Sequence, residues 1–309
     1  MTARAKENRT QATIDVAIPY RLDLTVSVLR RLSANVVDTL TSDGRYLRAF
    51  AGPGGPLFVR VAQERPDALE VALEGPRSEH AQALALVRRM LGVDRELAQF
   101  ERAARRIGWL APLATRMRGV KPPRYPTLWE ACVNAIVFQQ VSIHAASAIL
   151  RRFVVHLSAP LQSDGVVLHP FPAVERFARA DDGPLAAAGL SAAKIATLRR
   201  VATALCSGSL VESELEGLPS PDAAERLCQM KGIGPWTATV ILLRGLGRLD
   251  VFPMNDSGVA RALAAVSGRA ALDVDRLLSA LGSQRGMLYY HLLLARLEER
   301  GELGRASQY

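Results

Sequence analysis

The residues of this chain that could do chemistry are one aspartate and one glycine-rich turn. Asp256 precedes a stretch that carries apolar residues at helical spacing, from Ser257 to Val266. A carboxylate held at a fixed place can stabilise a developing positive charge and can orient a water molecule. An aspartate before a helix is also a good N-cap. The two roles are compatible, because capping fixes the direction of the side chain. Asp250 is the nearest competing acid.

The glycine-rich turn has the sequence Lys231-Gly232-Ile233-Gly234 and lies between two predicted helices. Pro235 suits the first position of the second helix, where its missing N–H costs nothing. Each glycine can adopt a positive φ or allow another backbone to approach closely. The free N–H groups at such a helix start, together with the helix dipole, form a binding site for one phosphate. The turn therefore predicts an anchor on the DNA backbone that is independent of base sequence.

The charge of the chain fits a polyanionic partner. The formal net charge is +9, the pI is about 10.0, and all but four of the 39 Lys and Arg residues are Arg. A basic balance of this size favours nucleic acid as the partner. Arginine suits bidentate contacts to phosphates. A GC-rich genome would also enrich arginine, but the positive charge is present under either explanation.

Cysteine usage and hydropathy argue against several other classes of protein. Cys132, Cys206 and Cys228 are far apart and form no CxxC motif, which argues against a zinc site or a disulfide framework. Residues 1–11 are polar, so we expect no secretory signal. No apolar run approaches the length of a membrane span. The expected location is the bacterial cytoplasm, close to the nucleoid.

Hydrophobic spacing predicts an α+β chain. Residues 1–11 are expected to form a disordered leader. Residues 12–120 are expected to form an N-terminal antiparallel β-sheet domain with helices. Alternation typical of half-buried strands occurs over 13–18, 46–50, 57–62 and 69–73, and a short amphipathic helix is predicted over 24–32.

Residues 121–309 are expected to form an all-helical domain. Thr127 and Glu130 predict a capping box for a helix that runs to Gln139. Asp94 is expected to cap an earlier helix. Further helices are predicted over 142–157, 174–179, after 182, and over 191–206, 223–229 and 257–266, with an irregular segment at 158–172.

A longer string around the hairpin is more specific than its glycines alone. Residues 227–238 have the sequence Leu-Cys-Gln-Met-Lys-Gly-Ile-Gly-Pro-Trp-Thr-Ala. This string resembles the helix-hairpin-helix of the base-excision DNA glycosylases, in particular the branch typified by bacterial 3-methyladenine DNA glycosylase II. An ordinary helical hairpin is the alternative. In residues 246–256 the final aspartate matches the family's catalytic position. Residues 135–142 resemble the turn that enters the DNA minor groove.

The resemblance implies roles for particular residues. Asp256 would be the catalytic carboxylate. Trp236, Phe138 and Tyr289 would line the pocket for the flipped base, although tryptophan and phenylalanine at such positions are also common in cores. Gln140 would fill the gap that the flipped base leaves in the duplex. The residues expected to bind DNA are Gln140, Lys231, Gly232, Gly234, Thr237 and Arg285, of which Arg285 could equally be a buried structural residue.

The resemblance also implies an activity: hydrolytic release of alkylated purines from double-stranded DNA by base flipping. Family members that also cut the backbone carry a lysine two residues after the second hairpin glycine. Here that position is Trp236, and an indole cannot form a Schiff base. We therefore expect a monofunctional enzyme without lyase activity. The alternatives are a glycosylase for deaminated or oxidised bases, and an inactive DNA-binding protein.

Two positions depart from the family's pocket. Gln284 aligns where close relatives have a second pocket tryptophan, and Val240 aligns where one relative has tyrosine. Tyr289 and Tyr290 could compensate. His291, on an apolar helix, is expected to be a core histidine. These departures leave the preferred lesion open.

The resemblance limits the cofactors that we expect. Some relatives hold an iron–sulfur cluster with four cysteines after the catalytic domain, but no Cys follows Cys228 here. No cofactor is expected to be required. The backbone carbonyls of Cys228, Met230 and Ile233 are candidates to hold a structural Na⁺ or K⁺, as the family hairpin often does. Damaged double-stranded DNA is the expected partner, no membrane is expected to be one, and the expected state is a monomer.

Overall fold

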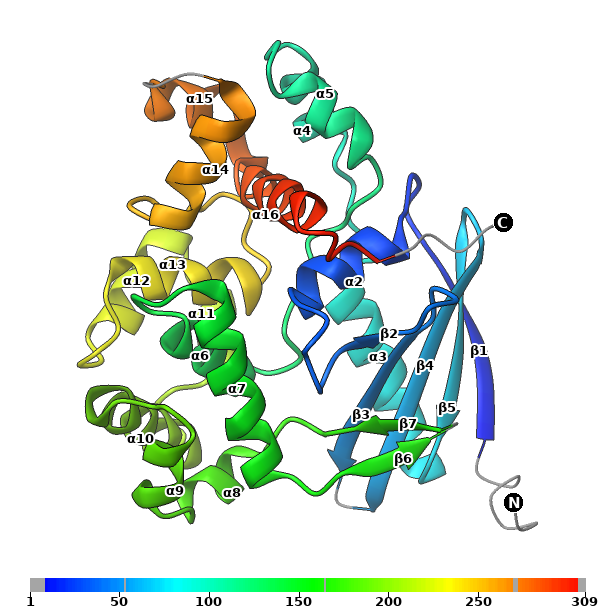
Figure 1. Ribbon diagram of the computed structural model, residues 1–309, viewed down its shortest axis with the longest axis vertical. Coiled ribbons are helices and arrows are strands. Elements are labelled where there is room, and N and C mark those ends of the chain that lie inside the picture. Colours follow the sequence, from blue (N-terminus) through cyan, green and yellow to red (C-terminus); the bar gives the residue numbers. More distant parts are fainter. Residues whose placement is uncertain (1–8, 53, 164, 269–271, 305–309) are drawn as a thin grey trace.

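The computed structural model describes residues 9–52, 54–163, 165–268 and 272–304, and it confirms the α+β class. A five-stranded antiparallel sheet with the order β1-β5-β4-β3-β2 forms one end of the molecule (Figure 1). Its strands are β1 (Arg9–Asp15), β2 (Thr39–Leu40), β3 (Tyr46–Gly52), β4 (Gly55–Arg65) and β5 (Ala68–Glu74).

The sheet buries one face against two helices. Alternate residues of β4 and β5, such as Val59, Val61 and Val71, are buried and share a core with α2 (Leu22–Arg30) and α3 (His80–Leu91). The alternation follows from the period of two in a strand, which sends successive side chains to opposite faces. The predicted sheet is therefore confirmed, and the helix expected over 24–32 is present over Leu22–Arg30.

The first strand begins earlier than expected. Residues 1–8 of the predicted leader lie outside the described residues, but Arg9 to Gln11 belong to β1, so the leader prediction was wrong there. The strand also ends before Val16 and Ile18. Asp15 pairs with Ala68, the first residue of β5, and the next residue, Val16, donates its N–H to the Asp67 carbonyl of the turn at 2.9 Å.

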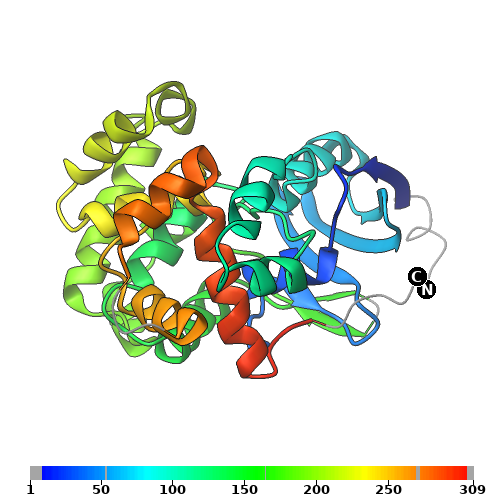
Figure 2. The ribbon, with the colours of Figure 1, turned by 90° about the horizontal axis from the view of Figure 1, so that it is seen from above.

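Most of the remaining chain is helical (Figures 1 and 2). The helices are α4 (Ala98–Arg105), α5 (Ala111–Arg116), α6 (Leu128–Val137), α7 (Ile143–Leu157), α8 (Val174–Ala178), α9 (Asp182–Ala187), α10 (Ala192–Cys206), α11 (Glu212–Gly217), α12 (Ser220–Cys228), α13 (Pro235–Arg244), α14 (Ser257–Ser267), α15 (Val274–Leu281) and α16 (Met287–Glu299), with short 3₁₀ turns η1 (Arg77–Glu79) and η2 (Gly282–Gln284).

Three local predictions were wrong. The segment 158–172 contains a hairpin of β6 (Leu161–Ser163) and β7 (Val166–Leu168), which lies beside β3 and buries Leu168 against it. Asp94 caps no helix, because Arg88 binds its carboxylate at 2.6 Å and α4 begins only at Ala98. The helix after Thr127 ends at Val137 rather than Gln139.

The capping box at Thr127 is half formed. The Thr127 hydroxyl accepts the N–H of Glu130 at 3.2 Å. The Glu130 carboxylate does not return to the helix start, because Arg48 of β3 binds it at 2.6 Å. Arg48 also donates to Asp38 at 2.6 Å, and Tyr46 donates to the same Asp38 oxygen at 2.7 Å. This buried cluster joins the sheet to α6.

Two cores hold the helices together. One contains side chains of α6, α7, α10, α12 and α13, and the other contains side chains of α2, α4, α5, α14, α15 and α16. Helices α4 and α5, placed in the first predicted unit, pack on the C-terminal helices. The boundary at residue 120 stays a prediction. Within the part of the chain that the structure describes, no helix has the length and apolarity to cross a membrane.

Candidate active site

A cleft of about 940 Å³ opens between the two helical cores. Five segments line it: Arg31 after α2, the turn between α6 and α7, the hairpin with α13, the start of α14, and α16. A cleft of this volume can hold a drug-sized ligand. One nucleotide is a ligand of that size. The cleft brings together Asp256, Trp236, Phe138, Tyr289, Gln140, Gly232, Gly234 and Thr237, which the sequence had singled out.

Asp256 is both a helix cap and a residue of the cleft. One carboxylate oxygen accepts the N–H groups of Gly258 at 2.7 Å and Val259 at 3.0 Å, at the start of α14. The other oxygen accepts the indole N–H of Trp236 at 2.9 Å. Three donors from two helices therefore fix the carboxylate. The interpretation that Asp256 caps α14 is confirmed, and its location leaves it facing the cleft.

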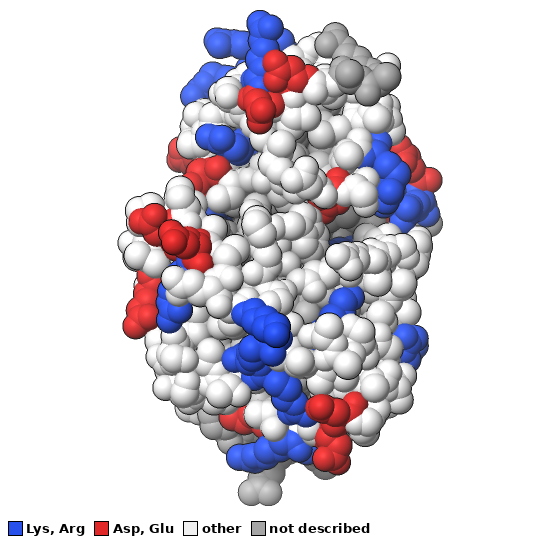
Figure 3. Space-filling model, turned by 90° about the vertical axis from the view of Figure 1, so that its left-hand side faces the viewer, with Lys and Arg blue, Asp and Glu red and all other residues white. Residues whose placement is uncertain are grey.

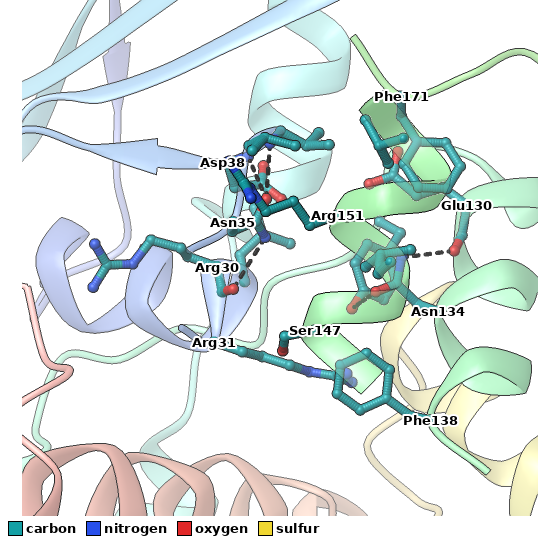
Figure 4. A pocket seen from close by; sticks show the side chains of 16 residues that line it. Arg30, Arg31, Asn35, Asp38, Glu130, Asn134, Phe138, Ser147, Arg151 and Phe171 are labelled. Carbon is teal, nitrogen blue, oxygen red and sulfur yellow. Dashed lines mark hydrogen bonds between the residues drawn. The ribbon is translucent and has the colours of Figure 1, made fainter. Parts of the chain in front are cut away.

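Three aromatic side chains contribute to the cleft wall. Trp236 and Tyr289 are half-buried, and so is Phe138. The Arg31 guanidinium lies over the Phe138 ring, 3.7 Å from its centroid, which leaves one face of Phe138 occupied. Figure 4 shows this pair beside a small inner cavity of about 20 Å³, and both residues line that cavity as well as the cleft. The Arg31–Phe138 pair therefore separates the two spaces.

A second buried arginine lies behind Arg31. Arg244 of α13 lies over the Tyr125 ring at 4.9 Å and donates to the Val28 carbonyl at 2.9 Å. Tyr289 lines the cleft and contributes to the electrostatic surroundings of both arginines. Burial lowers the pKa of Arg31, the neighbouring Arg244 lowers it further, and the Tyr125 and Tyr289 side chains oppose the shift. Arg31 therefore contributes a positive charge to the cleft lining, and Arg244, which does not line the cleft, adds a second charge behind it.

The hairpin is held by close packing and by α10. Gly232 has a φ of +99°, and a Cβ there would overlap the Thr197 hydroxyl. Gly234 precedes α13 and faces open space, so another backbone can approach it. Lys231 is exposed in the hairpin, and its carbonyl accepts the Arg200 Nε–H at 2.9 Å. This arrangement is that of a helix-start anion site.

The turn between α6 and α7 is fastened to the hairpin. Gln140 is exposed at this turn with a φ of +54°. The side-chain amide of the preceding Gln139 donates to the Gly232 carbonyl at 3.0 Å and to the Thr237 hydroxyl at 2.8 Å. Lys194 donates to the Gln139 carbonyl at 3.0 Å. Sequence analysis missed Gln139 and Lys194, because these contacts join residues 55 to 98 positions apart.

Several predicted residues lie elsewhere. Arg285 is not among the described residues that line the cleft, and it donates to the Gly282 carbonyl at 3.0 Å. Gln284 holds α4 instead, accepting from Phe100 N at 2.7 Å and donating to the Glu96 carbonyl at 2.9 Å. The buried Tyr290 donates to the Leu243 carbonyl at 3.1 Å and so adds no ring to the cleft. Val240 lines the cleft.

Two other candidates have structural surroundings. Asp250 accepts from the Ser220 hydroxyl at 3.0 Å, outside the cleft lining. His291 is buried against the Phe100 ring, 4.6 Å between centroids, which confirms the expected core histidine. Burial lowers the pKa of His291 to about 4.

Sequence analysis also missed a group of basic residues in the cleft. Arg261, Arg296 and Arg300 line its outer part. Desolvation lowers the pKa of Arg296, the charges of Arg300 and Arg261 lower it further, and Asp256 opposes the shift. On the face seen in Figure 3, Lys and Arg side chains gather in separate groups with uncharged surface between them. The positive charge is therefore concentrated at particular places.

The comparisons with known proteins agree with this geometry. Residues 133–280 match a family described as the HhH-GPD superfamily of base excision DNA repair proteins. The chain is 31% identical over 271 residues to a probable bifunctional transcriptional activator/DNA repair enzyme AlkA of Mycobacterium tuberculosis, with 85% of this chain and 53% of that protein covered. It is 28% identical over 171 residues to a DNA-3-methyladenine glycosylase of Bacillus subtilis, with 55% of this chain and 56% of that protein covered.

A solved structure shows the same fold over nearly the whole chain. The 3-methyladenine DNA glycosylase of Archaeoglobus fulgidus superimposes with a TM-score of 0.77 at 23% identity, covering 93% of this chain and 99% of that one. This chain spans about half the length of the Mycobacterium tuberculosis and Bacillus subtilis relatives.

A glycine hairpin between two helices, followed by an aspartate in a cleft, defines the helix-hairpin-helix class of DNA repair proteins. The chain belongs to the HhH-GPD superfamily of base excision DNA repair proteins, and its relatives include those of the 3-methyladenine branch. The resemblance stated from the sequence is thereby confirmed.

Proposed function

We propose that this protein is a DNA glycosylase that hydrolyses the N-glycosidic bond of alkylated purines, such as 3-methyladenine and 7-methylguanine, in double-stranded DNA. The observation that carries the proposal is the position of Asp256. Its carboxylate lies in a cleft of suitable size, and three N–H donors from α13 and α14 fix its direction. The names of the relatives support the choice of substrate.

Asp256 acts on the sugar. When the bond from C1′ to the base breaks, the electron pair leaves with the base, and positive charge develops on the deoxyribose. The fixed carboxylate stabilises that charge without having to reorganise during the reaction. Water then adds to C1′ and releases one proton. An alkylated purine is already cationic, so its departure requires no general acid.

The residues around Asp256 bind the DNA and hold the flipped base beside its carboxylate. The Gly232–Gly234 hairpin binds a phosphate through backbone N–H groups, and Lys231 adds a charge beside it. Gln140 projects from a turn that is fastened to the same hairpin, so backbone grip and wedge are rigidly coupled. Trp236 offers its indole face to the flipped base while its N–H holds Asp256.

The nucleophile in this proposal is water. Lyase activity requires an amine that forms a Schiff base with the sugar. Among the described residues that line the cleft there is no lysine. Trp236 occupies the position in question and donates to Asp256.

The test is single-turnover release of 7-methylguanine and 3-methyladenine from duplex oligonucleotides by wild type and by Asp256→Asn. Asparagine is also a good N-cap, so the fold should persist. We expect release to fall at least about 100-fold, the cost of losing one preorganised electrostatic partner. Asp250→Asn, outside the cleft, is the matched control and should retain wild-type rates.

Three results would count against the proposal. Wild-type activity in Asp256→Asn would refute the mechanism. Wild-type release at the uncatalysed rate for both bases would refute the substrate class. Binding to DNA without release of any damaged base would favour the inactive DNA-binding protein instead.

A second candidate, a glycosylase for deaminated or oxidised bases, is favoured by the floor of the cleft. Gln284 and Tyr290 point elsewhere, and Arg31 covers one face of Phe138, so stacking surface is limited. The positive charge of Arg31 would favour a base that carries a carbonyl oxygen, as deaminated and oxidised purines do.

We also propose that the hairpin can hold a monovalent cation with a structural role. The carbonyls of Cys228, Met230 and Ile233 belong to one turn between α12 and α13. Met230 O accepts the Ile233 N–H at 2.9 Å and keeps a second lone pair. Na⁺ or K⁺ there would rigidify the turn, and Asp256 would act as described without it.

A further inference from the structure

Two buried arginines, Arg31 in the cleft lining and Arg244 behind it, are not neutralised by acids. Arg31 is 5% exposed and Arg244 is 1% exposed. Among the described residues, no ion pair includes either of them. Arg31 Nη1 and Arg244 Nε and Nη1 are buried in that part of the chain without a hydrogen-bond partner. Buried N–H groups without partners are costly and rare, so this arrangement requires an explanation.

The contacts that Arg31 does make aim it at the cleft. Its guanidinium lies against the Phe138 ring, and Arg31, Phe138 and Tyr289 all line the cleft. Arg244 is close enough to lower the pKa of Arg31, so a second positive charge lies behind the first. In a buried site a charge acts strongly over several ångströms. The floor therefore presents a positive potential to whatever enters the cleft, and a ligand atom that reaches the Arg31 Nη1 would supply the hydrogen-bond partner that this group lacks.

We propose that Arg31, supported by Arg244, is a specificity-determining residue that selects purines with a carbonyl oxygen at C6. This inference rests on the proposed glycosylase function. The favoured substrates are 7-methylguanine and hypoxanthine. 3-Methyladenine is disfavoured, because its C6 carries an amino group that is itself a donor.

The reaction explains why a carbonyl gains from this floor. The C1′–N9 bond breaks with its electron pair on the purine, and that electron density extends to O6. Arg31 donates to O6, and the two guanidinium charges stabilise the density as it forms. Water adds to C1′ and releases its proton to solvent. Hypoxanthine carries no methyl group and therefore no positive charge that would help it to leave, so its release depends on this contact most.

A structural brace is the competing explanation, and the two make different predictions. A brace would affect every substrate equally. A specificity residue would change the ratio between C6-carbonyl and C6-amino substrates. The ratio of rates is therefore the informative measurement.

The experiment measures single-turnover release of 7-methylguanine, hypoxanthine and 3-methyladenine from full-length wild type, Arg31→Gln and Arg31→Lys, each rate divided by the uncatalysed rate. We expect wild type to favour the two C6-carbonyl bases. Arg31→Gln should slow their release at least tenfold and that of 3-methyladenine less than threefold. Arg31→Lys keeps the charge and should restore most of the ratio. Arg151→Gln is the matched control, because Arg151 is exposed and lines only the inner cavity.

The possible outcomes separate this inference from the function on which it rests. Equal slowing of all three bases by Arg31→Gln would overturn the inference and leave the glycosylase intact. A wild type that favours 3-methyladenine would overturn it without any variant, even if Arg31→Gln did not fold. Release of hypoxanthine alone, lost in Arg31→Gln, would support the inference and refute the alkylated-purine proposal. Release of no base would overturn both.

Discussion

Arg48 and Arg31 are both buried arginines, but their surroundings balance their charges differently. Arg48 donates to two carboxylates, Asp38 and Glu130, each at 2.6 Å. Arg31 lies on the Phe138 ring and next to a second arginine, and no ion pair of the described residues includes it. One site holds more negative than positive charge, and the other holds only positive charge.

The difference separates a structural site from a candidate functional one. A buried ion pair contributes little net stability, yet removing one partner is strongly destabilising. The Arg48 cluster fits that description, because it joins β3 to α6 and lies away from the cleft lining. A buried charge without a counter-ion costs stability, and the Arg31 charge becomes useful only when a ligand supplies negative charge.

Arg48→Met should have the largest effect on stability. It leaves Asp38 and Glu130 buried without a cation, which should lower the free energy of unfolding by about 3–5 kcal/mol. Urea unfolding at pH 7.5 measures this change. Arg65→Met is the control, because Arg65 forms only exposed pairs and should cost less than about 1 kcal/mol. Equal losses in the two variants would contradict the structural role of the cluster.

Glu130 should make stability depend on pH. Burial and the neighbouring Asp38 raise its pKa, Arg48 only partly offsets them, and the net change is from 4.5 to about 7. Between pH 4.5 and 7 the folded state therefore holds a proton that the unfolded state has lost. The free energy of unfolding should fall as pH rises through this window, by roughly 3 kcal/mol. Unfolding at pH 5 and 7.5 should show this contribution in wild type and lose it in Glu130→Gln.

His291 should contribute a pH dependence of opposite sign. Burial lowers its pKa from 6.5 to about 4, so the unfolded state binds the proton first as pH falls. This contribution is complete above pH 6.5 and is lost between pH 6.5 and 4, by roughly 3 kcal/mol. His291→Phe should remove that loss, as measured by unfolding at pH 4.5 and 7. An unchanged acid sensitivity would show that His291 titrates normally.

Arg31→Met should change stability far less than Arg48→Met. The variant loses the contact with Phe138 but also removes an uncompensated buried charge, so the free energy of unfolding should change by less than about 1 kcal/mol. Urea unfolding of both variants under one buffer tests this directly. A loss of several kcal/mol would mean that Arg31 is a brace like Arg48.

Lys231→Ala should have the smallest effect. Lys231 is an exposed cation in the hairpin that we propose binds a phosphate. The variant should weaken binding to any duplex by a few-fold and reduce the slope of log affinity against log salt by about 1. Titrations of undamaged DNA at two salt concentrations measure both. A loss that depends on the lesion would instead place Lys231 near the base.

Local sequence patterns predicted the parts of this molecule that are set by neighbouring residues. The strands over 57–62 and 69–73, the caps at Thr127 and Ser142, and the helix start at Pro235 depend on short-range spacing, and all are present. The motif around Gly232 and Asp256 predicted two sides of the cleft. Its electrostatic floor could not be predicted, because Arg31 and Arg244 are 213 positions apart in sequence.

The misplaced predictions have the same cause. Asp94 and Glu130 both fit local capping patterns, but arginines from elsewhere bind them more strongly. Gln284 aligned with a pocket position, yet its amide satisfies the backbone of α4. Hydrogen bonds to partners outside the local pattern, from 6 to 188 positions away in sequence, therefore decided the direction of each of these side chains.

Arg31 lies more than a hundred residues before the segment 133–280 that defines the superfamily. If it helps to choose the base, then the choice of lesion and the chemistry of cleavage are inherited on different parts of the gene. A lineage could change its lesion repertoire by substitution in the sheet-bearing half while hairpin and aspartate stay constant. Relatives grouped by their shared segment would then differ in the damage they remove.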